Sequence, residues 1–214
     1  MSAAPFSIRA AMRAFAHDRT AAGAAEFALV LPLLLLLILG TIDVGLYAWR
    51  INQAEKATQT GARWAVATDM IASGLQSYSF ASSGGIPQGT VVGVSAFPGV
   101  TCQSGGTSVS CTCATGGSCA FPLTASNTAF TTLVNRMKQI DGRITASNVV
   151  VTYGWSGLGF SGDPNGPDVA PLTTVSLRNM NYTPISTLVF GVQVPLPTFA
   201  YTLTMEDGSG TVSN

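Results

Sequence analysis

A long apolar stretch lies near the start of the chain. No ionisable residue occurs between Phe27 and Ile42, and the stretch continues past Asp43 as far as Trp49. A helix needs about 20 apolar residues to cross the hydrocarbon core of a bilayer, and this stretch is longer. A buried core helix is the alternative, but a helix that is apolar on every face would need protein on every side. The pattern therefore predicts a transmembrane helix.

A cleaved secretory signal would also place an apolar stretch near the start of a chain. Such signals have apolar cores of about 7–15 residues, followed by small residues at a cleavage site. Here the apolar core is longer, and Tyr47-Ala48-Trp49-Arg50 follows it. Aromatic residues next to a charged residue are typical of a membrane interface. We therefore expect the helix to be retained as a single-pass anchor.

Helical periodicity continues beyond the apolar stretch. One face collects residues at spacings of three and four: Tyr47, Ile51, Ala54, Thr58, Gly61 and Ala65. Small residues on this face allow another backbone to approach closely. The face is expected to dock against the chain's own outer domain, and a partner helix is the alternative. Residues 22–68 are thus predicted to form one long helix, half in lipid and half outside.

Shorter segments follow the long helix. Residues 69–90 are rich in Ser and Gly and are predicted to form a loop. Strands are expected at Thr90–Phe97, Val109–Cys113, Asn148–Trp155, Thr173–Leu177, Leu188–Val194 and Phe199–Met205. Pro195 and Pro197 separate the last two, because proline cannot donate a hydrogen bond to a sheet.

One further helix is expected among these strands. Apolar residues recur at helical spacing at Phe130, Leu133, Val134, Met137 and Ile140. Asn127 is the expected N-cap, and Gly142 is the expected stop. The fold class is therefore α+β, with a long N-terminal transmembrane helix followed by a small antiparallel β-sheet domain with one packed helix.

The four cysteines lie in one short, Gly-rich segment: Cys102, Cys111, Cys113 and Cys119. A dense, even set of cysteines is typical of disulfides in an oxidising compartment. A Cys111–Cys113 bridge would close a strained loop, so Cys102–Cys111 with Cys113–Cys119 is the preferred pairing among the three possible. A zinc site is the alternative, although Cys-x-Cys fits zinc spacing poorly. Because the positive-inside rule barely discriminates here, the cysteines decide that the N-terminus is inside and the later residues are outside.

Charged side chains make up only 9% of the chain, against about 25% in an average soluble domain. Ten basic and ten acidic residues cancel without forming a basic cluster, so no nucleic-acid partner is expected. The only histidine, His17, precedes the apolar stretch, so no Ser-His-Asp or Cys-His site is expected in the outer domain. Residues 163–168 loosely resemble a calcium loop, but Thr174 stands where the closing Glu would be, which favours a plain turn. Neither an enzymatic activity nor a cofactor is expected.

The start of the apolar stretch carries a recognisable pattern. The segment Ala21-Ala22-Gly23-Ala24-Ala25-Glu26-Phe27-Ala28-Leu29-Val30-Leu31-Pro32-Leu33 combines small residues, a glutamate and a Leu run. It resembles the N-terminal signature of the TadE/TadG-like family, the minor pilins or pseudopilins of tight-adherence (Flp-type) pilus systems. The resemblance continues through residues 40–45, which include Asp43, and through residues 53–67, which include Gly61-Ala62-Arg63. It covers about residues 19–68.

The resemblance implies processing by a prepilin peptidase on the cytoplasmic side. The retained glutamate, Glu26, would lie five residues into the mature chain, which places the cut between Ala21 and Ala22. Family members carry Gly before the cut, whereas Gly23 is displaced here by two residues, so a cut after Gly23 is the alternative.

The resemblance also suggests three residues with roles in assembly. Glu26 would pair with the free N-terminal amine of a neighbouring subunit and set the axial register, because a buried carboxylate needs a cation. Pro32 is expected to loosen the helix or simply to be tolerated in the membrane. Asp43 is either a further assembly residue or a solvated residue at the membrane boundary.

These expectations divide the chain into a cytoplasmic leader (1–21), a transmembrane and extended helix (22–68) and an extracytoplasmic, disulfide-bearing β-rich domain (69–214). The expected function is that of a membrane-anchored minor pilin or pseudopilin in Flp/Tad-type pilus assembly and adhesion. The expected location is the bacterial inner membrane, with the C-terminal domain in the periplasm. Expected partners are the membrane, other pilin subunits, the Tad/Flp assembly machinery and the prepilin peptidase. The alternative is a membrane-anchored envelope binding domain with no role in a pilus.

Overall fold

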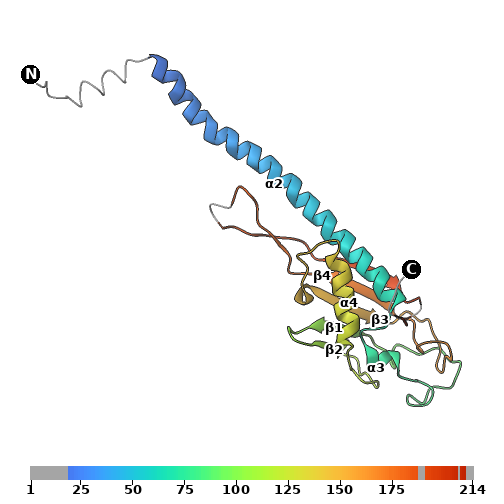
Figure 1. The fold of residues 1–214 in the computed structure, drawn as a ribbon. Helices are drawn as coiled ribbons and strands as arrows, with labels where there is room; N and C mark the ends of the chain where they lie inside the picture. The colour runs from blue at the N-terminus through green and yellow to red at the C-terminus, as the bar shows by residue number, and fades with distance from the viewer. Residues whose placement is uncertain (1–18, 188–190, 207, 211–214) are drawn as a thin grey trace, which may run out of the picture. The chain divides into compact units, whose positions relative to one another are not determined.

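The first helix, α2, runs without interruption from Arg19 to Ala67 and contains Pro32 (Figure 1). The computed structural model describes residues 19–187, 191–206 and 208–210, so most of the expected leader, with His17, lies outside the described residues. The chain forms two compact units. The N-terminal unit comprises Met1–Tyr47 with Thr183–Val192, and the sheet unit comprises Ala48–Tyr182 with Gln193–Asn214.

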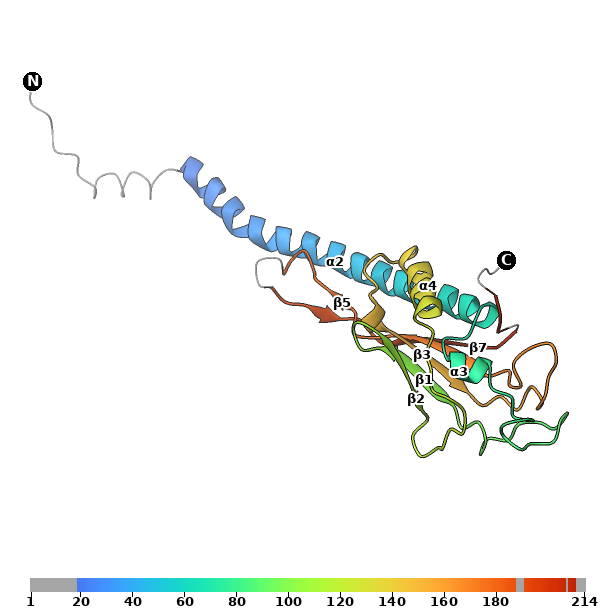
Figure 2. The ribbon, with the colours of Figure 1, turned by 60° about the horizontal axis from the view of Figure 1, so that its bottom comes forward.

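The sheet unit is built on five antiparallel strands in the order β2-β1-β3-β4-β7 (Figure 2). Their bounds are Val100–Ser104 (β1), Val109–Cys113 (β2), Val149–Gly154 (β3), Leu172–Leu177 (β4) and Phe199–Thr204 (β7). Strands β5 (Asn181–Tyr182) and β6 (Val194–Pro195) pair separately. A long helix and an antiparallel sheet with a packed helix confirm the expected α+β class.

Alternation along the strands gives the main sheet two different faces. One face carries side chains that are buried, among them Cys102, Val151, Tyr153, Val175 and Leu177. The opposite face carries mainly Thr and Ser, as expected for an antiparallel sheet that is covered on one side only. Register pairs Cys102 with Val151 and Val151 with Val175, so the buried side chains form continuous rows across the sheet.

Helix α4 (Asn127–Lys138) confirms the expected helix, and its apolar residues Phe130, Leu133, Val134 and Met137 are buried. Its N-cap is Ser126, whose hydroxyl accepts the backbone N–H of Ala129 at 3.2 Å, and not Asn127. The expected stop at Gly142 is also wrong. The helix ends at Lys138, because the next residues turn so that the N–H groups of Ile140 and Asp141 both bond to the Met137 carbonyl.

The second half of α2 belongs to the core of the sheet unit. Ala54, Ala57 and Ala62 are fully buried, and the Thr58 hydroxyl donates a hydrogen bond to the Ala54 carbonyl at 2.8 Å. After the helix, the backbone N–H of Ile71 donates to the phenol oxygen of Tyr153 at 2.9 Å. Complete burial raises the pKa of Tyr153 well above its ordinary value, so this side chain remains a neutral core residue.

Three expected segments differ in the structure. Residues 90–97 form turns and not a strand: Gly89 donates to the Ser161 carbonyl and Ser161 donates to the Thr90 carbonyl, but no ladder of backbone bonds continues from this pair. Strand β1 was not expected, although Val100-Thr101-Cys102-Gln103 alternates apolar and polar residues as a half-buried strand does. Of the expected strand 188–194, residues 188–190 lie outside the described part, and only Val194 joins the short β6. The expected loop at 69–90 contains one helical turn, α3 (Ser73–Gln76), and the short 3-10 helix η1 (Ala146–Asn148) precedes β3.

Candidate functional site

The first half of α2 exposes its apolar side chains. Leu29 is 80% exposed, Leu33 and Val44 are each 71% exposed, and only 6% of the most apolar 18-residue stretch is buried. The expectation that this is not a core helix is therefore met within the described residues, which leave the apolar surface uncovered. By length and composition, α2 is long and apolar enough to cross a membrane.

Glu26 lies at the leading edge of this apolar surface. Its side chain is exposed, and among the residues that the structure describes it has no hydrogen-bond or ion-pair partner. A carboxylate in this position is accessible to a cation from outside the unit. The suggested cleavage positions, Ala21 and Ala22, lie five and four residues earlier, within the first turns of α2.

Pro32 lies six residues beyond Glu26, inside the helix. Proline has no backbone N–H and therefore removes one hydrogen bond from the preceding turn. The helix nevertheless continues on both sides of Pro32. Because a transmembrane helix tolerates such a gap, Pro32 is compatible with a continuous span.

Asp43 occupies a different environment from Glu26. Its side chain is only 7% exposed, and its two carboxylate oxygens accept the backbone N–H groups of Ile185 and Ser186 at 2.6 and 2.8 Å. These are charge-assisted hydrogen bonds, which are stronger than bonds between neutral groups. Asp43 is therefore not a solvated boundary residue; it holds a distant loop of the chain against the helix within the N-terminal unit.

The loop that Asp43 binds is closed by its own hydrogen bonds. The Thr187 N–H bonds to the Pro184 carbonyl at 3.3 Å, and the Gly191 N–H bonds to the Thr187 carbonyl at 2.7 Å. Gly191 adopts a φ of 65°, a left-handed conformation that favours glycine. Asp43 and this loop are 142 residues apart in the chain, so sequence spacing alone could not reveal the contact.

The second half of α2 packs against α4 inside the sheet unit. A Cβ atom added at Gly61 would lie 2.9 Å from Cγ and Sδ of Met137, so only glycine fits without movement. On the neighbouring surface, the Arg136 guanidinium lies 5.5 Å from the ring centre of Trp64, within range of a cation–π contact. The small-residue face thus docks against the chain's own domain, as preferred over a partner helix.

Residues 21–63 match a family model whose description is TadE-like protein. This segment is TadE-like. It includes Glu26, Pro32, Asp43 and Gly61, and therefore joins the exposed apolar half of α2 to the docked half. The TadE-like segment indicates a protein associated with Tad pilus systems. Comparisons with curated proteins and with solved structures gave no match.

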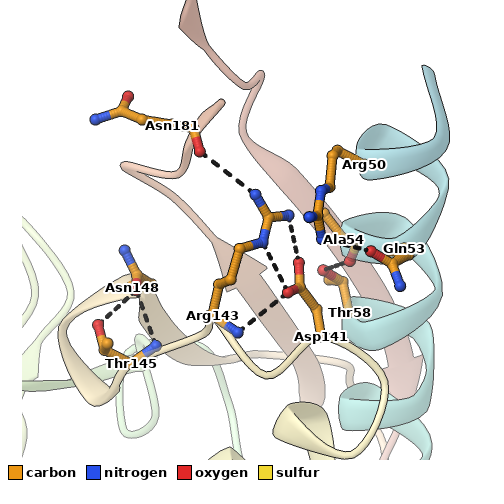
Figure 3. A network of polar contacts seen from close by, with 9 residues as sticks. All are labelled: Arg50, Gln53, Ala54, Thr58, Asp141, Arg143, Thr145, Asn148 and Asn181. Atoms are coloured by element: carbon orange, nitrogen blue, oxygen red, sulfur yellow. Dashed lines mark hydrogen bonds and ion pairs between the residues drawn. The ribbon is translucent and has the colours of Figure 1, made fainter. Parts of the chain in front are cut away.

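A polar network closes the sheet unit beside the docked half of the TadE-like segment (Figure 3). The Asp141 carboxylate accepts Nε and Nη2 of Arg143 at 3.0 and 2.8 Å, and Arg143 also reaches the Asn181 carbonyl at the start of β5. Burial alone would raise the pKa of Asp141, but hydrogen bonds and charge from Arg143, with a smaller contribution from Arg50, hold it below its ordinary value. The ion pair therefore fixes the turn after α4 to the strand that leads into the loop.

The structure joins Cys102 to Cys111 and Cys113 to Cys119, the pairing preferred from the sequence. The first bridge connects paired positions on β1 and β2, and the second connects the end of β2 to the following loop. Every sulfur of the four cysteines is thus in a bridge and not available as a thiolate ligand.

The acidic loop at residues 163–168 has its carboxylates occupied by the backbone. Asp168 accepts the N–H groups of Phe80 and Asp163 at 2.6 and 3.2 Å, and Asp163 accepts the N–H of Asn165 at 2.9 Å. Such bonds are typical of turns that an Asp side chain closes. The arrangement agrees with a plain turn.

One surface feature was not expected from the sequence. A row of five threonines crosses all five strands on the open face of the sheet: Thr112, Thr101, Thr152, Thr174 and Thr202. Hydroxyl pairs lie 3.3 Å apart on β1 and β3, and 2.8 Å apart on β4 and β7. Each strand has one of these residues at its solvent-facing positions, so the signal was present, but only the strand register aligns them.

Proposed function

We propose that this chain is a single-pass, membrane-anchored, minor pilin-like subunit that acts in assembly of a Tad-type pilus. The observation that carries the proposal is the division of the TadE-like helix. Its first half exposes a continuous apolar surface, and its second half is buried in a folded domain. A helix of this kind inserts into a bilayer or packs among similar helices while presenting the domain outside.

The orientation that we propose places the sheet unit outside the cytoplasm, in the periplasm of a bacterial inner membrane. The two disulfides support this side, because disulfides persist in oxidising compartments and are rare in the cytosol. Trp49, half exposed and stacked with Arg50 at 4.7 Å, suits the outer interface. Protease added to intact spheroplasts tests this orientation. The protease should digest the sheet unit only if that unit lies outside the cytoplasm.

Glu26 is the residue that we propose for subunit register. A carboxylate among apolar side chains is costly in a membrane and becomes tolerable when a cation pairs with it. Glu26 is exposed and has no partner within the described chain, which leaves it accessible to the terminal amine of a neighbouring processed subunit. Other pilin subunits, the Tad/Flp machinery and the prepilin peptidase are the partners that this role requires.

The test of this role is Glu26→Leu in the native host. We expect the variant to stay in the membrane fraction and to be lost from sheared pili or from the assembly complex. Glu55→Leu is the matched control, because Glu55 is also exposed on α2 but lies in the sheet unit. Incorporation of both variants at the wild-type level would contradict the role of Glu26.

The mature N-terminus gives an independent test. Mass spectrometry of the protein from its native host should find a chain that starts at Ala22 or, after the alternative cut, at Ala24. An intact N-terminus would mean a permanently anchored protein and would remove the pilin-like processing from the proposal.

A second candidate function is a membrane-anchored binding domain with no pilus role. The open sheet face favours it, because the threonine row offers an uncharged, hydroxyl-rich surface of the kind that hydrogen-bonds to polymers such as glycans. An intact N-terminus together with binding of the purified protein to cell-wall polymers would support this candidate. In both candidates we propose a structural or binding role and not catalysis, in keeping with the position of the only histidine, His17.

A further inference from the structure

A loop from far along the chain is held at the apolar half of α2. The oxygens of Asp43 accept backbone N–H groups of Ile185 and Ser186 at 2.6 and 2.8 Å, which fixes this part of the loop at the level of Asp43. The helix up to Tyr47 and the loop Thr183–Val192 belong to the same compact unit. The depth of Asp43 in a membrane therefore determines the depth of the loop.

Helix geometry gives that depth. An α-helix rises about 1.5 Å per residue, so Asp43 lies about 24 Å along the axis from Phe27, the first apolar residue after Glu26. The hydrocarbon core of a bilayer is about 30 Å thick. With Phe27 at the inner edge, Asp43 lies about 6 Å inside the outer edge, and tilt of the helix takes it deeper.

The chemistry of the loop suits this position. No charged residue occurs from Thr183 to Val192, and the side chains of Ile185 and Val192 are 46% and 50% exposed. Burying irregular backbone away from water, near the outer edge of the bilayer, is costly unless its polar groups are hydrogen-bonded. The N–H groups of Ile185, Ser186, Thr187 and Gly191 all have acceptors, and Pro184 has no N–H to satisfy.

We propose that the described parts of this loop, Thr183–Thr187 and Gly191–Val192, insert into the outer leaflet beside α2 and contact lipid acyl chains. The proposal rests on the membrane anchoring proposed above and adds a second membrane contact to it. The loop exposes apolar side chains of its own, and the absence of charge favours acyl chains as the occupant. Asp43 is the positioning residue, because its carboxylate accepts hydrogen bonds from two backbone N–H groups of the loop in place of water.

The test measures the depth of spin labels in the full-length protein. Single cysteines at Ile185 and Val192 are labelled without reductant, so that the native bridges stay closed, and the protein is placed in phosphatidylethanolamine–phosphatidylglycerol vesicles. Labels at Leu33 and Val44 report the membrane span itself, and a label at the exposed Ser110 on the sheet reports the aqueous side. We expect the labels at 185 and 192 to favour oxygen over a water-soluble nickel chelate, as the label at 44 does.

The outcomes separate this proposal from the membrane anchoring. A label at 185 that favours the nickel chelate, while the label at 33 favours oxygen, would overturn the loop insertion and leave the anchor intact. A label at 185 shielded from both reagents would mean a protein neighbour and would also overturn it. A label at 33 that favours the nickel chelate would refute the anchor itself.

Asp43→Ala tests the positioning role. We expect this variant to raise nickel-chelate accessibility at 185 several-fold while the label at 33 remains in lipid. Glu55→Ala, on the same helix, should change neither label. An unchanged label at 185 in Asp43→Ala would show that the carboxylate does not hold the loop and would overturn this part of the proposal.

Discussion

Gly61 offers a quantitative test of how the TadE-like helix docks in the sheet unit. In Gly61→Ala, the new methyl group would lie 2.9 Å from two atoms of Met137 and 3.5 Å from Leu133. Overpacking of a core costs about 1–3 kcal/mol. Alanine has a higher helix propensity than glycine, which returns up to about 1 kcal/mol. The net expectation is a loss of about 0–2 kcal/mol in the free energy of unfolding.

A substitution of the contacted residue, Met137, separates the cost of overpacking from the gain in helix propensity. Met137 is fully buried, so Met137→Ala should cost about 2–5 kcal/mol by leaving a cavity. In that background, the methyl group of Gly61→Ala enters vacated space, and the same substitution should stabilise the protein by about 0.5–1 kcal/mol. The double-mutant cycle should therefore give a coupling energy of about 1–3 kcal/mol.

The cycle can be measured on the full-length protein in a mild detergent. Chemical unfolding of the sheet unit is followed by tryptophan fluorescence, since Trp64 lies beside Arg136 at this interface. Gly45→Ala is the matched control, because no atom lies within 4 Å of a Cβ added there. A coupling energy below about 0.5 kcal/mol would refute close packing of Gly61 against Met137.

Two further predictions concern the sheet unit. Reduction of the disulfides should lower the melting temperature of the sheet unit, and so should the paired substitutions Cys102→Ala and Cys111→Ala. The reason is that each short disulfide loop contributes about 2.5 kcal/mol to the free energy of unfolding. Equal melting temperatures with and without reductant would show that neither this bridge nor Cys113–Cys119 forms. Asp141→Asn should destabilise the unit by about 1–2 kcal/mol at pH 7, because the lowered pKa means that the charged carboxylate stabilises the folded state. Since that contribution is present above the ordinary pKa of 3.8 and is lost as the pH falls through the lower folded value, wild type and variant should converge in acid; a difference that does not depend on pH would contradict the ion pair.

The sequence was most informative where periodicity and burial coincide. The apolar stretch, α4 and β3 were predicted because each has a regular pattern over several turns or pleats. The segment 90–97 was wrongly predicted as a strand because its apolar residues alternate with small ones, yet the chain there turns at Gly93, whose carbonyl accepts from Ala96 and Phe97. Local pattern cannot distinguish a strand from a series of turns when no partner strand is known.

The long-range contacts could not be predicted from the sequence. Asp43 was recognised as unusual within an apolar stretch, but its partners at residues 185 and 186 are backbone groups, which every residue carries. The alignment of five threonines likewise depends on strand register. By contrast, the cysteine pairing was accessible, because proximity in the chain restricts short bridges to few arrangements.

The composition of α2 explains why anchoring and folding can be tested separately. Branched side chains dominate the exposed half, where they add apolar surface, whereas Ala54, Ala57, Gly61 and Ala62 dominate the docked half, where a larger side chain would meet the core. Substitutions at distant sites without shared contacts are usually additive. A change at Glu26 should therefore leave the unfolding of the sheet unit unchanged, so a loss of assembly in Glu26→Leu would report on the membrane-side interface and not on misfolding.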